Sequence, residues 1–429
     1  MAASIVHAGD YLLVISGHSI AHYSTTDGIN EVIDVSDGDE TQPRVTESTD
    51  KTEDKPDKEH LTRKDKDAGE GTYRILAFKL SHSKKYLAVS TDNKQLLLYK
   101  LDARCQLISR RCVIRRVSCM SFDRAEEFVL CADKSGDVYR YPVREPEKTG
   151  DLLLGHLSMV LDVVISPNDE FILTCDRDEK IRISRYPNCY NIHAFCLGHT
   201  EFVTAMCLLD GFNDLMVSGS GDATIRLWNY RDGRPLSCID CKRHTVTNVN
   251  DNLAVQCLRY HSPSRLLAVS FKKQKSVLLF VVEEKDRSTH LSLEQHLSTT
   301  GDVWDLNFDA DGNLFVLQNI ENETVLIFTK NESGKYDESK SNSYTAMMDR
   351  INSDWKFFAD SLQHDDDPGY SSLYKVKFDN MKEYLEKKHK RINAGKASSA
   401  ETEEEGKVLA SSAEINNEPP LKKNKIVSS

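Results

Sequence analysis

The sequence has no apolar run long enough to cross a membrane. Its longest, VLLFVV at 277–282, is far short of the roughly 20 residues that a spanning helix requires. Residues 1–15 lack a basic region and include Asp10, so they do not resemble a secretory signal peptide. The 11 cysteines are scattered and odd in number, which favours free thiols in a reducing compartment over a disulfide framework. We therefore expect a protein of the nucleus, with the cytoplasm as a further location.

Motifs of catalysis are also missing. The chain has no P-loop, no GxGxxG after a strand, no GxSxG and no HExxH. Cys238 and Cys241 have CxxC spacing, but without a second pair they are expected to be ordinary strand cysteines rather than zinc ligands. The net charge of −11 argues against indiscriminate binding to nucleic acid, so any such contact must come from a local basic patch. We expect no enzyme and no metal site.

What the chain does contain is an internal repeat. Residues 198–230 hold a Gly-His pair, an apolar strand, LMVSGSGD and TIRLWN, the pattern of a WD repeat. A matching unit begins with Gly155-His156, and 198 − 155 gives a spacing of 43. A period in the forties with four short strands predicts the blades of a β-propeller. The third strands of successive units end at Tyr99, Tyr141, Ser184, Trp228, Phe280 and Phe328.

The fullest repeat carries three residues with an expected structural role: His199, Asp222 and Trp228. In WD-repeat proteins such residues form a hydrogen-bonded chain with a strand serine, here Ser218 or Ser220, that satisfies buried polar groups. A catalytic His-Asp-Ser arrangement is disfavoured, because no nucleophile elbow accompanies these residues.

The predicted fold is all-β: a seven-bladed WD40 β-propeller with a short C-terminal helix and a disordered insert and tail. Six blades are visible, and the seventh is inferred from strands at both chain ends, which can share a blade and close the ring. Residues 34–70 contain 20 charged residues in 37 and predict a disordered acidic insert. The expected order is N-terminal strands of the closing blade (1–33), insert (34–70), blades (71–330), connector with ring-closing strand 371–379 (331–380), basic amphipathic helix (381–394) and disordered tail (395–429).

Charged clusters are the candidates for binding. The hairpin CDRDEKIRIS, 175–184, is either a solvated turn or a charge-complementary docking site, and Asp178 in it occupies the turn position of the repeat. RRCVIRR at 110–116, with Lys134 nearby, and the basic run 387–391 are candidates for phosphate contact, with ordinary surface charge as the alternative.

Four segments carry a specific resemblance: ADKSGDVYRY (132–141), LGHLSMVLDVVISPNDEFILTCDRDEKIR (154–182), CLGHTEFV (196–203) and SSLYKVKFDN (371–380). They resemble the non-catalytic WD-repeat subunit of the tRNA (guanine-N7) methyltransferase. The resemblance implies a heterodimer in which a separate subunit binds S-adenosylmethionine and methylates a guanine in the tRNA variable loop. The propeller is then expected to hold no cofactor, to stabilise the catalytic subunit and to help seat the tRNA.

The resemblance also implies roles for individual residues. The expected partner-binding residues are Asp178, Glu179, Lys180 and Arg182. The residues expected to face the RNA are Arg115, Arg116, Lys134, Lys387, Lys388, Lys390 and Arg391.

A substrate receptor of a cullin-type ubiquitin ligase is the alternative function. Such receptors carry WDxR at the end of a blade, and Trp228-Asn229-Tyr230-Arg231 differs from it by one residue.

Overall fold

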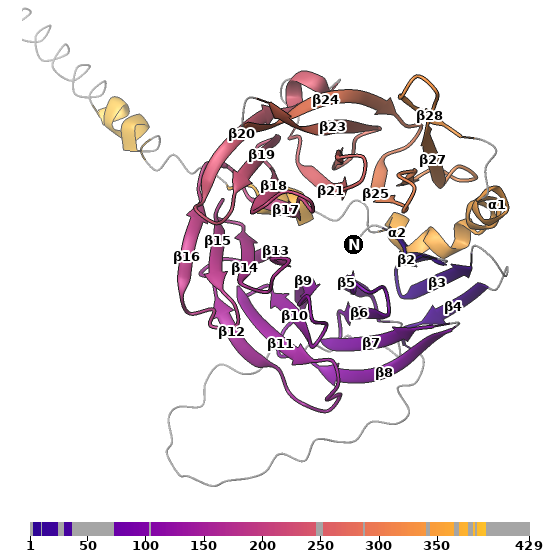
Figure 1. Ribbon diagram of the computed structural model, residues 1–429. Coiled ribbons are helices and arrows are strands. Elements are labelled where there is room, and N and C mark those ends of the chain that lie inside the picture. The colour runs from indigo at the N-terminus through magenta and orange to yellow at the C-terminus, as the bar shows by residue number, and fades with distance from the viewer. Residues whose placement is uncertain are drawn as a thin grey trace, which may run out of the picture. The chain divides into compact units, whose positions relative to one another are not determined.

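Seven four-stranded antiparallel sheets stand around a common axis in the first of two compact units (Figure 1). This unit spans Met1–Tyr374 and the second spans Lys375–Ser429. The seven-bladed propeller predicted from the sequence is therefore confirmed. The computed structural model describes residues 3–9, 11–24, 30–36, 73–102, 104–245, 252–285, 288–339, 344–363, 369–375, 381 and 384–391.

Each blade uses four consecutive strands, of which the first lies nearest the axis. Blade 1 is formed by β1 (Ser4–His7), β2 (Tyr11–Ser16), β3 (Ser19–Ser24) and β4 (Asn30–Asp34), and blade 2 by β5 (Ile75–Leu80), β6 (Tyr86–Thr91), β7 (Gln95–Leu101) and β8 (Cys105–Cys112). Blade 3 is formed by β9 (Val117–Phe122), β10 (Phe128–Asp133), β11 (Asp137–Pro142) and β12 (Asp151–Gly155). Blade 4 is formed by β13 (Val160–Ile165), β14 (Phe171–Asp176), β15 (Ile181–Arg185) and β16 (Ile192–Cys196). Blades 5 to 7 are β17 (Val203–Leu208), β18 (Leu215–Ser220), β19 (Thr224–Asn229), β20 (Arg234–Asp240); β21 (Val255–His261), β22 (Leu266–Phe271), β23 (Ser276–Lys285), β24 (Ser288–Ser298); and β25 (Val303–Phe308), β26 (Leu314–Gln318), β27 (Val325–Lys330), β28 (Tyr336–Glu338).

The second strand of a blade is covered on both faces by its neighbours. All six residues of β14, FILTCD, are buried, and so are all six of β18, LMVSGS. Such strands read as continuous apolar or small runs rather than as alternating ones. The outer strands meet solvent, as in β16, where Ile192 and Phe195 are exposed. The core is therefore a ring of apolar layers between successive blades.

The N-terminal blade is complete without any C-terminal strand. Strand β4 pairs with β3 along its length, so β1 to β4 form a full blade from the N-terminus alone. The predicted strand sharing between the chain ends is therefore wrong. Gly369–Leu373, at the start of the predicted ring-closing strand, forms a short helix, α3. The predicted end of the blades at 330 is also wrong, because β28 at 336–338 completes blade 7.

Helices occupy part of the predicted connector and cover the junction of blades 7 and 1. They are α1 (Thr345–Ser353), the 3-10 turn η2 (Trp355–Phe358) and α2 (Ala359–Gln363). Their buried side chains Met347, Ile351 and Phe358 pack into one apolar cluster with residues of both blades. The Ser16 and Ser361 hydroxyls form a buried hydrogen bond of 2.8 Å, and Asn352 Oδ1 accepts from the Val325 backbone at 3.0 Å. We name residues 344–363 the strap.

The inner strands of blades 7 and 1 are joined by a buried carboxylate. Asp305, 2% exposed, accepts a hydrogen bond from the Ile5 backbone at 3.2 Å and from Arg259 at 2.8 Å. Asp162 makes the equivalent contact inside the ring, accepting from the Met206 backbone of blade 5 at 2.8 Å. Both aspartates follow a register shift of the inner strand. The ring thus closes with the same link that it uses between internal blades.

The predicted basic helix at 381–394 is described in part. Met381 and residues 384–391 are helical, and residues 392–394 lie outside the described residues. Most of the predicted insert, from residue 37, and the whole predicted tail at 395–429 also lie outside them. In the part of the chain that the structure describes, no helix is long and apolar enough to span a membrane.

Loss of the strap's central aromatic should weaken ring closure. Phe358 is 1% exposed and contacts Trp304 of blade 7 at 6.0 Å between ring centroids. We expect Phe358→Ala to lower the free energy of unfolding by about 3–5 kcal/mol, because it leaves a cavity at the junction. Urea unfolding measures the change, and the half-buried neighbour Phe357→Ala should cost less. Equal costs for the two variants would contradict the role assigned to the strap.

Candidate functional site

The candidate site residues of the ring gather on one edge of the blades. Because strands in a blade alternate in direction, the turn between its second and third strands lies at the same edge as the loop to the next blade. We name this edge the connector face. It carries the predicted docking turn between β14 and β15, the β8–β9 loop with Arg115 and Arg116, and the β10–β11 turn with Lys134.

In blade 5, His199 and its partners form a buried chain of hydrogen bonds. The His199 ring contacts Asp222 Oδ2 at 3.0 Å through Nδ1 and Ser218 Oγ at 2.8 Å through Nε2. The Trp228 indole N–H donates to the same Ser218 oxygen at 2.8 Å. Burial alone would raise the pKa of Asp222, but the hydrogen bond from His199 and its other donors outweigh it and hold the pKa well below its usual range. Of the two candidate serines, Ser218 completes the chain.

Blade 4 repeats this arrangement with a different aspartate from the one expected. His156 contacts Asp176 Oδ2 at 3.1 Å and Thr174 Oγ1 at 2.8 Å. Asp178 stands at the position that matches Asp222 in strand register, yet Asp176, at the end of β14, takes the role. Asp178 occupies the predicted turn position, but the contact with the histidine is made by Asp176. Asp178 is half-buried in the turn.

The same carboxylate shapes the docking turn. Asp176 Oδ1 accepts from the backbone N–H of Asp178 at 2.9 Å and of Lys180 at 3.2 Å. Burial opposes ionisation of Asp176, but these bonds and the one from His156 lower its pKa overall. Glu179 has a φ of 71°, a left-handed conformation that is costly for a residue with a side chain. A buried anion thus holds the three residues Asp178, Glu179 and Lys180 in one tight, outward turn.

Arg182 of blade 4 contacts the end of the outer strand of blade 3. Its guanidinium donates to the Gly155 carbonyl at 2.9 Å, and the residue is half-buried. Gly155 precedes His156, so this bond braces the loop that enters blade 4. Arg182 is positioned to support the turn, whereas the exposed Lys180 is positioned to meet a partner.

The predicted cationic residues of blades 2 and 3 come together. Arg115, Arg116 and Lys134 are all exposed, and the Lys134 N–H donates to the Arg116 carbonyl at 3.4 Å. Lys94, which the sequence analysis missed, joins them, since its carbonyl accepts from the Val113 N–H at 2.8 Å. The β6–β7 turn that holds Lys94 corresponds in the repeat to the β10–β11 turn that holds Lys134, and this correspondence could have found it. We name Lys94, Arg115, Arg116 and Lys134 the basic cluster.

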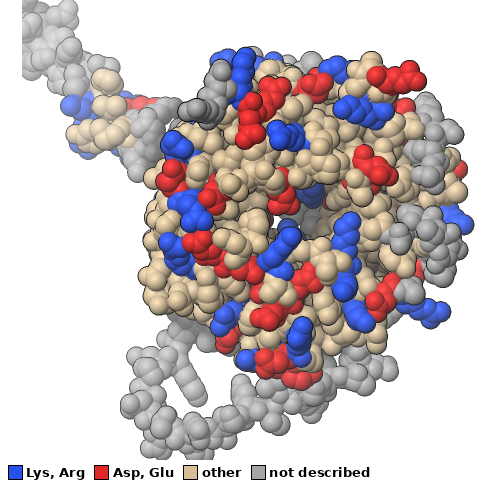
Figure 2. All heavy atoms as spheres, viewed as in Figure 1, with Lys and Arg blue, Asp and Glu red and all other residues tan. Residues whose placement is uncertain are grey.

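The run RRCVIRR is split by the fold. Arg111 is 7% exposed and donates to the Pro142 carbonyl at 2.8 Å, while Arg110 donates to Gln95. Both lie on the outer strand β8, where Arg111 reaches blade 3 and Arg110 also donates to the Val35 carbonyl beside blade 1 at 3.4 Å, so only Arg115 and Arg116 remain on the connector face. Figure 2 shows one face of the ring, where cationic and anionic side chains interleave around a central hollow. Attraction of a polyanion must therefore be local.

The second unit carries the remaining basic candidates. Lys387, Lys388, Lys390 and Arg391 are exposed on the helical stretch 384–391. Its apolar residues Tyr384 and Leu385 are also exposed, at 58% and 43%.

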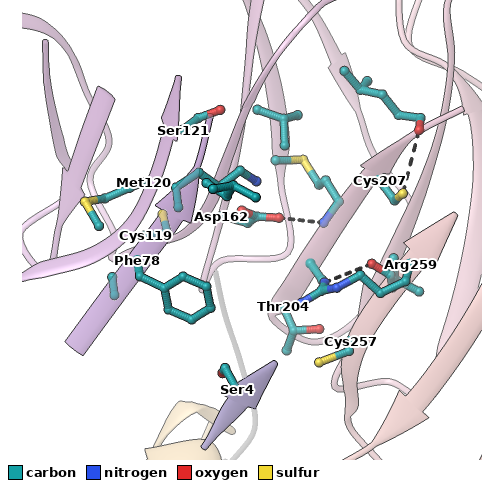
Figure 3. Close-up of a pocket in the computed structure, with 18 of the residues that line it drawn as sticks. Ser4, Phe78, Cys119, Met120, Ser121, Asp162, Thr204, Cys207, Cys257 and Arg259 are labelled. Atoms are coloured by element: carbon teal, nitrogen blue, oxygen red, sulfur yellow. Dashed lines mark hydrogen bonds between the residues drawn. The ribbon is translucent and has the colours of Figure 1, made fainter. Parts of the chain in front are cut away.

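A cavity of about 650 Å³ lies along the axis of the ring. Figure 3 shows Asp162 at its wall with the hydrogen bond to blade 5. Burial raises the pKa of the Cys207 thiol to about 11 and that of Cys257 to about 12, so both stay protonated and weakly nucleophilic at neutral pH. Within the described ranges, no three His, Cys, Asp or Glu side chains are grouped so as to hold a metal. Residues labelled at the wall include Ser4, Phe78, Cys119, Asp162, Cys207, Cys257 and Arg259.

Comparison with protein families gives two overlapping matches that span the ring. Residues 16–151 and 143–345 both match the family described as the tRNA methyltransferase TRM82 WD40 domain. This chain belongs to that family.

Individual relatives of this family member match over most of their length. A zebrafish protein named tRNA (guanine-N(7)-)-methyltransferase non-catalytic subunit wdr4 is 38% identical over 76% of this chain and 81% of its own. The human protein of that name is 37% identical over 74% of this chain and 77% of its own. A relative from Aedes aegypti, named tRNA (guanine-N(7)-)-methyltransferase non-catalytic subunit wuho, is 34% identical over 76% of this chain and 81% of its own.

Solved structures show the fold alone. The WD40 repeats of RRP9 share 19% identity and a TM-score of 0.57, over 74% of this chain and 88% of theirs. A chain in the mitotic checkpoint complex shares 14% identity and a TM-score of 0.56, over 74% and 86%. Both match this member of the TRM82 family as a propeller.

Arg231, on which the ligase alternative depended, is engaged within the ring. It donates to Asp214 at 2.8 Å and to Glu170 of blade 4 at 2.9 Å. The two carboxylates raise the pKa of Arg231 further above its usual range. The names of the relatives support the methyltransferase function rather than the ligase one.

The buried His199–Asp222 pair should make stability depend on pH. The pKa of Asp222 is lower in the folded chain than in the unfolded one, so its contribution is present above about pH 4 and is lost as the pH falls further. At pH 7, Asp222→Asn should lower the free energy of unfolding by about 1–3 kcal/mol.

Urea unfolding at pH 7 and at pH 3 measures this effect. The variant should lose less stability on acidification than the parent chain. Asp232→Asn, at a side chain 54% exposed, is the control and should match the parent at both pH values. An Asp222→Asn variant with the parent's pH profile would refute the assignment.

Proposed function

We propose that this chain is the non-catalytic subunit of a tRNA (guanine-N7) methyltransferase. The family match across residues 16–345 carries the proposal, supported by relatives named as that subunit. The chain pairs with a catalytic subunit as a heterodimer, stabilises it and helps seat tRNA, and the catalytic subunit binds S-adenosylmethionine. We also propose a nuclear location with a cytoplasmic pool, which microscopy of a tagged chain tests.

A methylation assay with separated and combined subunits tests the central claim. The chain alone should neither bind S-adenosylmethionine in calorimetry nor methylate tRNA. Combined with the catalytic subunit, it should raise the yield of 7-methylguanosine above that of the catalytic subunit alone. Turnover by the purified single chain, or no stimulation of the catalytic subunit, would refute the proposal.

The docking turn is the proposed contact with the catalytic subunit. Its backbone is fixed by Asp176, and the half-buried Asp178 and Glu179 and the exposed Lys180 offer both signs of charge within three positions. Mixed charges on a rigid turn set register and partner choice, because a wrong partner meets like charge. Arg182 supports the turn indirectly, because its hydrogen bond to the Gly155 carbonyl holds the loop that enters blade 4.

Charge reversal in the turn should weaken the heterodimer. We expect the double variant Glu179→Lys, Lys180→Glu to raise Kd by the equivalent of about 2–5 kcal/mol, if the charges are paired and desolvated at the contact. Glu283→Lys, at an exposed residue near the C-terminal end of β23, is the control and should leave Kd unchanged. A folded double variant that pairs normally would place docking elsewhere.

Arg182→Leu tests the supporting role in the same assay. Because Arg182 of blade 4 bonds the Gly155 carbonyl of blade 3, its loss should lower thermal stability together with heterodimer affinity. The turn variants should lower affinity alone. If Arg182→Leu lowers affinity without lowering stability, Arg182 contacts the partner directly.

The basic cluster and the C-terminal basic helix are the proposed RNA contacts. The chain is acidic overall, so these local groups must supply the attraction. All four side chains of the cluster are cationic, which favours contact with RNA phosphates. The contact is therefore expected to position tRNA rather than to select its sequence.

Removal of residues 386–429 should weaken tRNA binding and leave the heterodimer intact. The log–log salt dependence of binding should fall by about 0.7–0.9 for each RNA phosphate that the shortened chain no longer binds. Filter binding at several salt concentrations measures both affinity and slope. Turnover at saturating tRNA should change less than turnover at low tRNA, because uniform binding acts mainly through KM. Unchanged affinity and slope would refute an RNA contact by this region.

A further inference from the structure

The last segment of the first unit is fastened to blades 4 and 5. Helix α3, Gly369–Leu373, and the following Tyr374 meet residues almost 200 positions earlier in the chain. Arg177 donates from Nε to the Leu373 carbonyl at 3.1 Å and from a terminal nitrogen to the Ser372 carbonyl at 3.0 Å. The Tyr374 hydroxyl donates to the Gly221 carbonyl at 3.0 Å.

Arg177 acts as a C-terminal cap. The last carbonyls of a helix have no partner within the helix, and a cationic donor satisfies them while matching the helix dipole. A helix of five residues is far too short to form by itself in water. The conformation of α3 therefore depends on this tertiary contact.

Two tyrosines one helical turn apart complete the anchor. Tyr370 and Tyr374 both meet the ring of Phe202 edge-on, with centroid distances of 6.2 and 4.9 Å. Phe202 is fully buried and packs so closely on Gly221 that a Cβ there would come within 2.6 Å of it. The anchor thus presses on a fixed part of the blade 5 entry loop.

The place of the anchor is specific. Arg177 directly precedes Asp178 in the docking turn, so one turn holds α3 on one side and presents charges on the other. Of the described residues that precede α3, Ser361 holds the chain at the junction of blades 7 and 1 through its hydrogen bond to Ser16. The anchor moves the chain's exit from that junction to the docking turn.

We infer that Arg177 and Tyr374 are positioning residues that fix, at the docking turn, the point from which the basic C-terminal helix reaches the RNA. The inference rests on the proposed RNA contact of that helix. Residue 384 lies ten positions after Tyr374, so the described helical stretch 384–391 begins within about 35 Å of the anchor along the chain. From Ser361 the tether would be 23 residues long.

The length of the tether gives the size of the effect. Effective concentration falls roughly as the −3/2 power of linker length, and lengthening from 10 to 23 residues lowers it about 3- to 4-fold. Loss of the anchor also moves the point from which the tethered helix can reach RNA from blades 4 and 5 to the junction of blades 7 and 1. We therefore expect tRNA affinity to fall at least about 3-fold when the anchor is removed.

A double-mutant cycle on the heterodimer tests the inference. The variants are Arg177→Ala with Tyr374→Ala, each made in the full chain and in the chain lacking residues 386–429, and tRNA affinity is measured for all four combinations. The anchor substitutions should weaken binding at least about 3-fold in the full chain and not at all in the truncated one. Arg177→Lys, which keeps the charge without the two-pronged donor, should fall between. Arg234→Ala, exposed on β20, is the charge-matched control.

Each other result overturns the inference in its own way. An equal loss of affinity in both chains would mean that Arg177 contacts RNA directly. A loss of heterodimer affinity would make α3 part of the docking surface. No effect of the anchor variants, with weaker binding after truncation, would show that the tail needs no tether. If truncation itself has no effect, the proposed RNA contact of the helix fails and the tether fails with it.

Limited proteolysis supplies a readout without RNA. Trypsin cleavage after Lys375 requires the anchored segment to leave the ring, so it reports the opening of α3. The anchor variants should be cleaved there several-fold faster than the parent and than Arg234→Ala. An unchanged cleavage rate would show that Arg177 and Tyr374 do not hold the segment.

Discussion

The bond between Asp305 and the Ile5 backbone is the contact on which the ring depends, because it joins the first blade to the last. The ring closes, and the inner edges of the first and last blades are protected, only if these two inner strands meet. Arg259 lies 2.8 Å from the same carboxylate and compensates its burial. The strap then covers the junction with apolar side chains, so closure needs no shared strand.

A closed ring gives the connector face its rigidity, and one side chain in blade 4 carries that rigidity to the docking turn. Asp176 bonds His156 of the blade interior with one oxygen and the turn backbone with the other. The strained φ of Glu179 persists because both ends of the turn are held. The surface that meets a partner is thus an extension of the core, and changes in the core at Asp176 or Arg182 reach it.

Features that recur in every repeat could be predicted from the sequence. Features whose conformation depends on a single long-range contact could not. Spacing and strand patterns were enough for six blades and for the chain of His199, Asp222 and Trp228, whereas the strands of the seventh blade were only partly predicted. The alternating SSLYKVKFD was predicted as a strand, because short apolar alternation says nothing of a cap supplied by Arg177, 195 residues away. The sequence also placed Asp178 in the turn column correctly, but could not show that the His156 ring reaches Asp176 two residues earlier.

Arginine illustrates the same limit for the binding surface. In the sequence, Arg110, Arg111, Arg115 and Arg116 form one basic run. In the fold, Arg111 donates to the Pro142 carbonyl of blade 3 and Arg110 to the Val35 carbonyl beside blade 1, because a planar guanidinium with five donors suits the junctions between blades. Even the exposed Arg116 donates through Nε to the Asp92 carbonyl, so its guanidinium is held beside the β6–β7 turn. Cationic residues thus divide into those that join the blades and those left on the connector face, and only the contacts of each side chain reveal which is which.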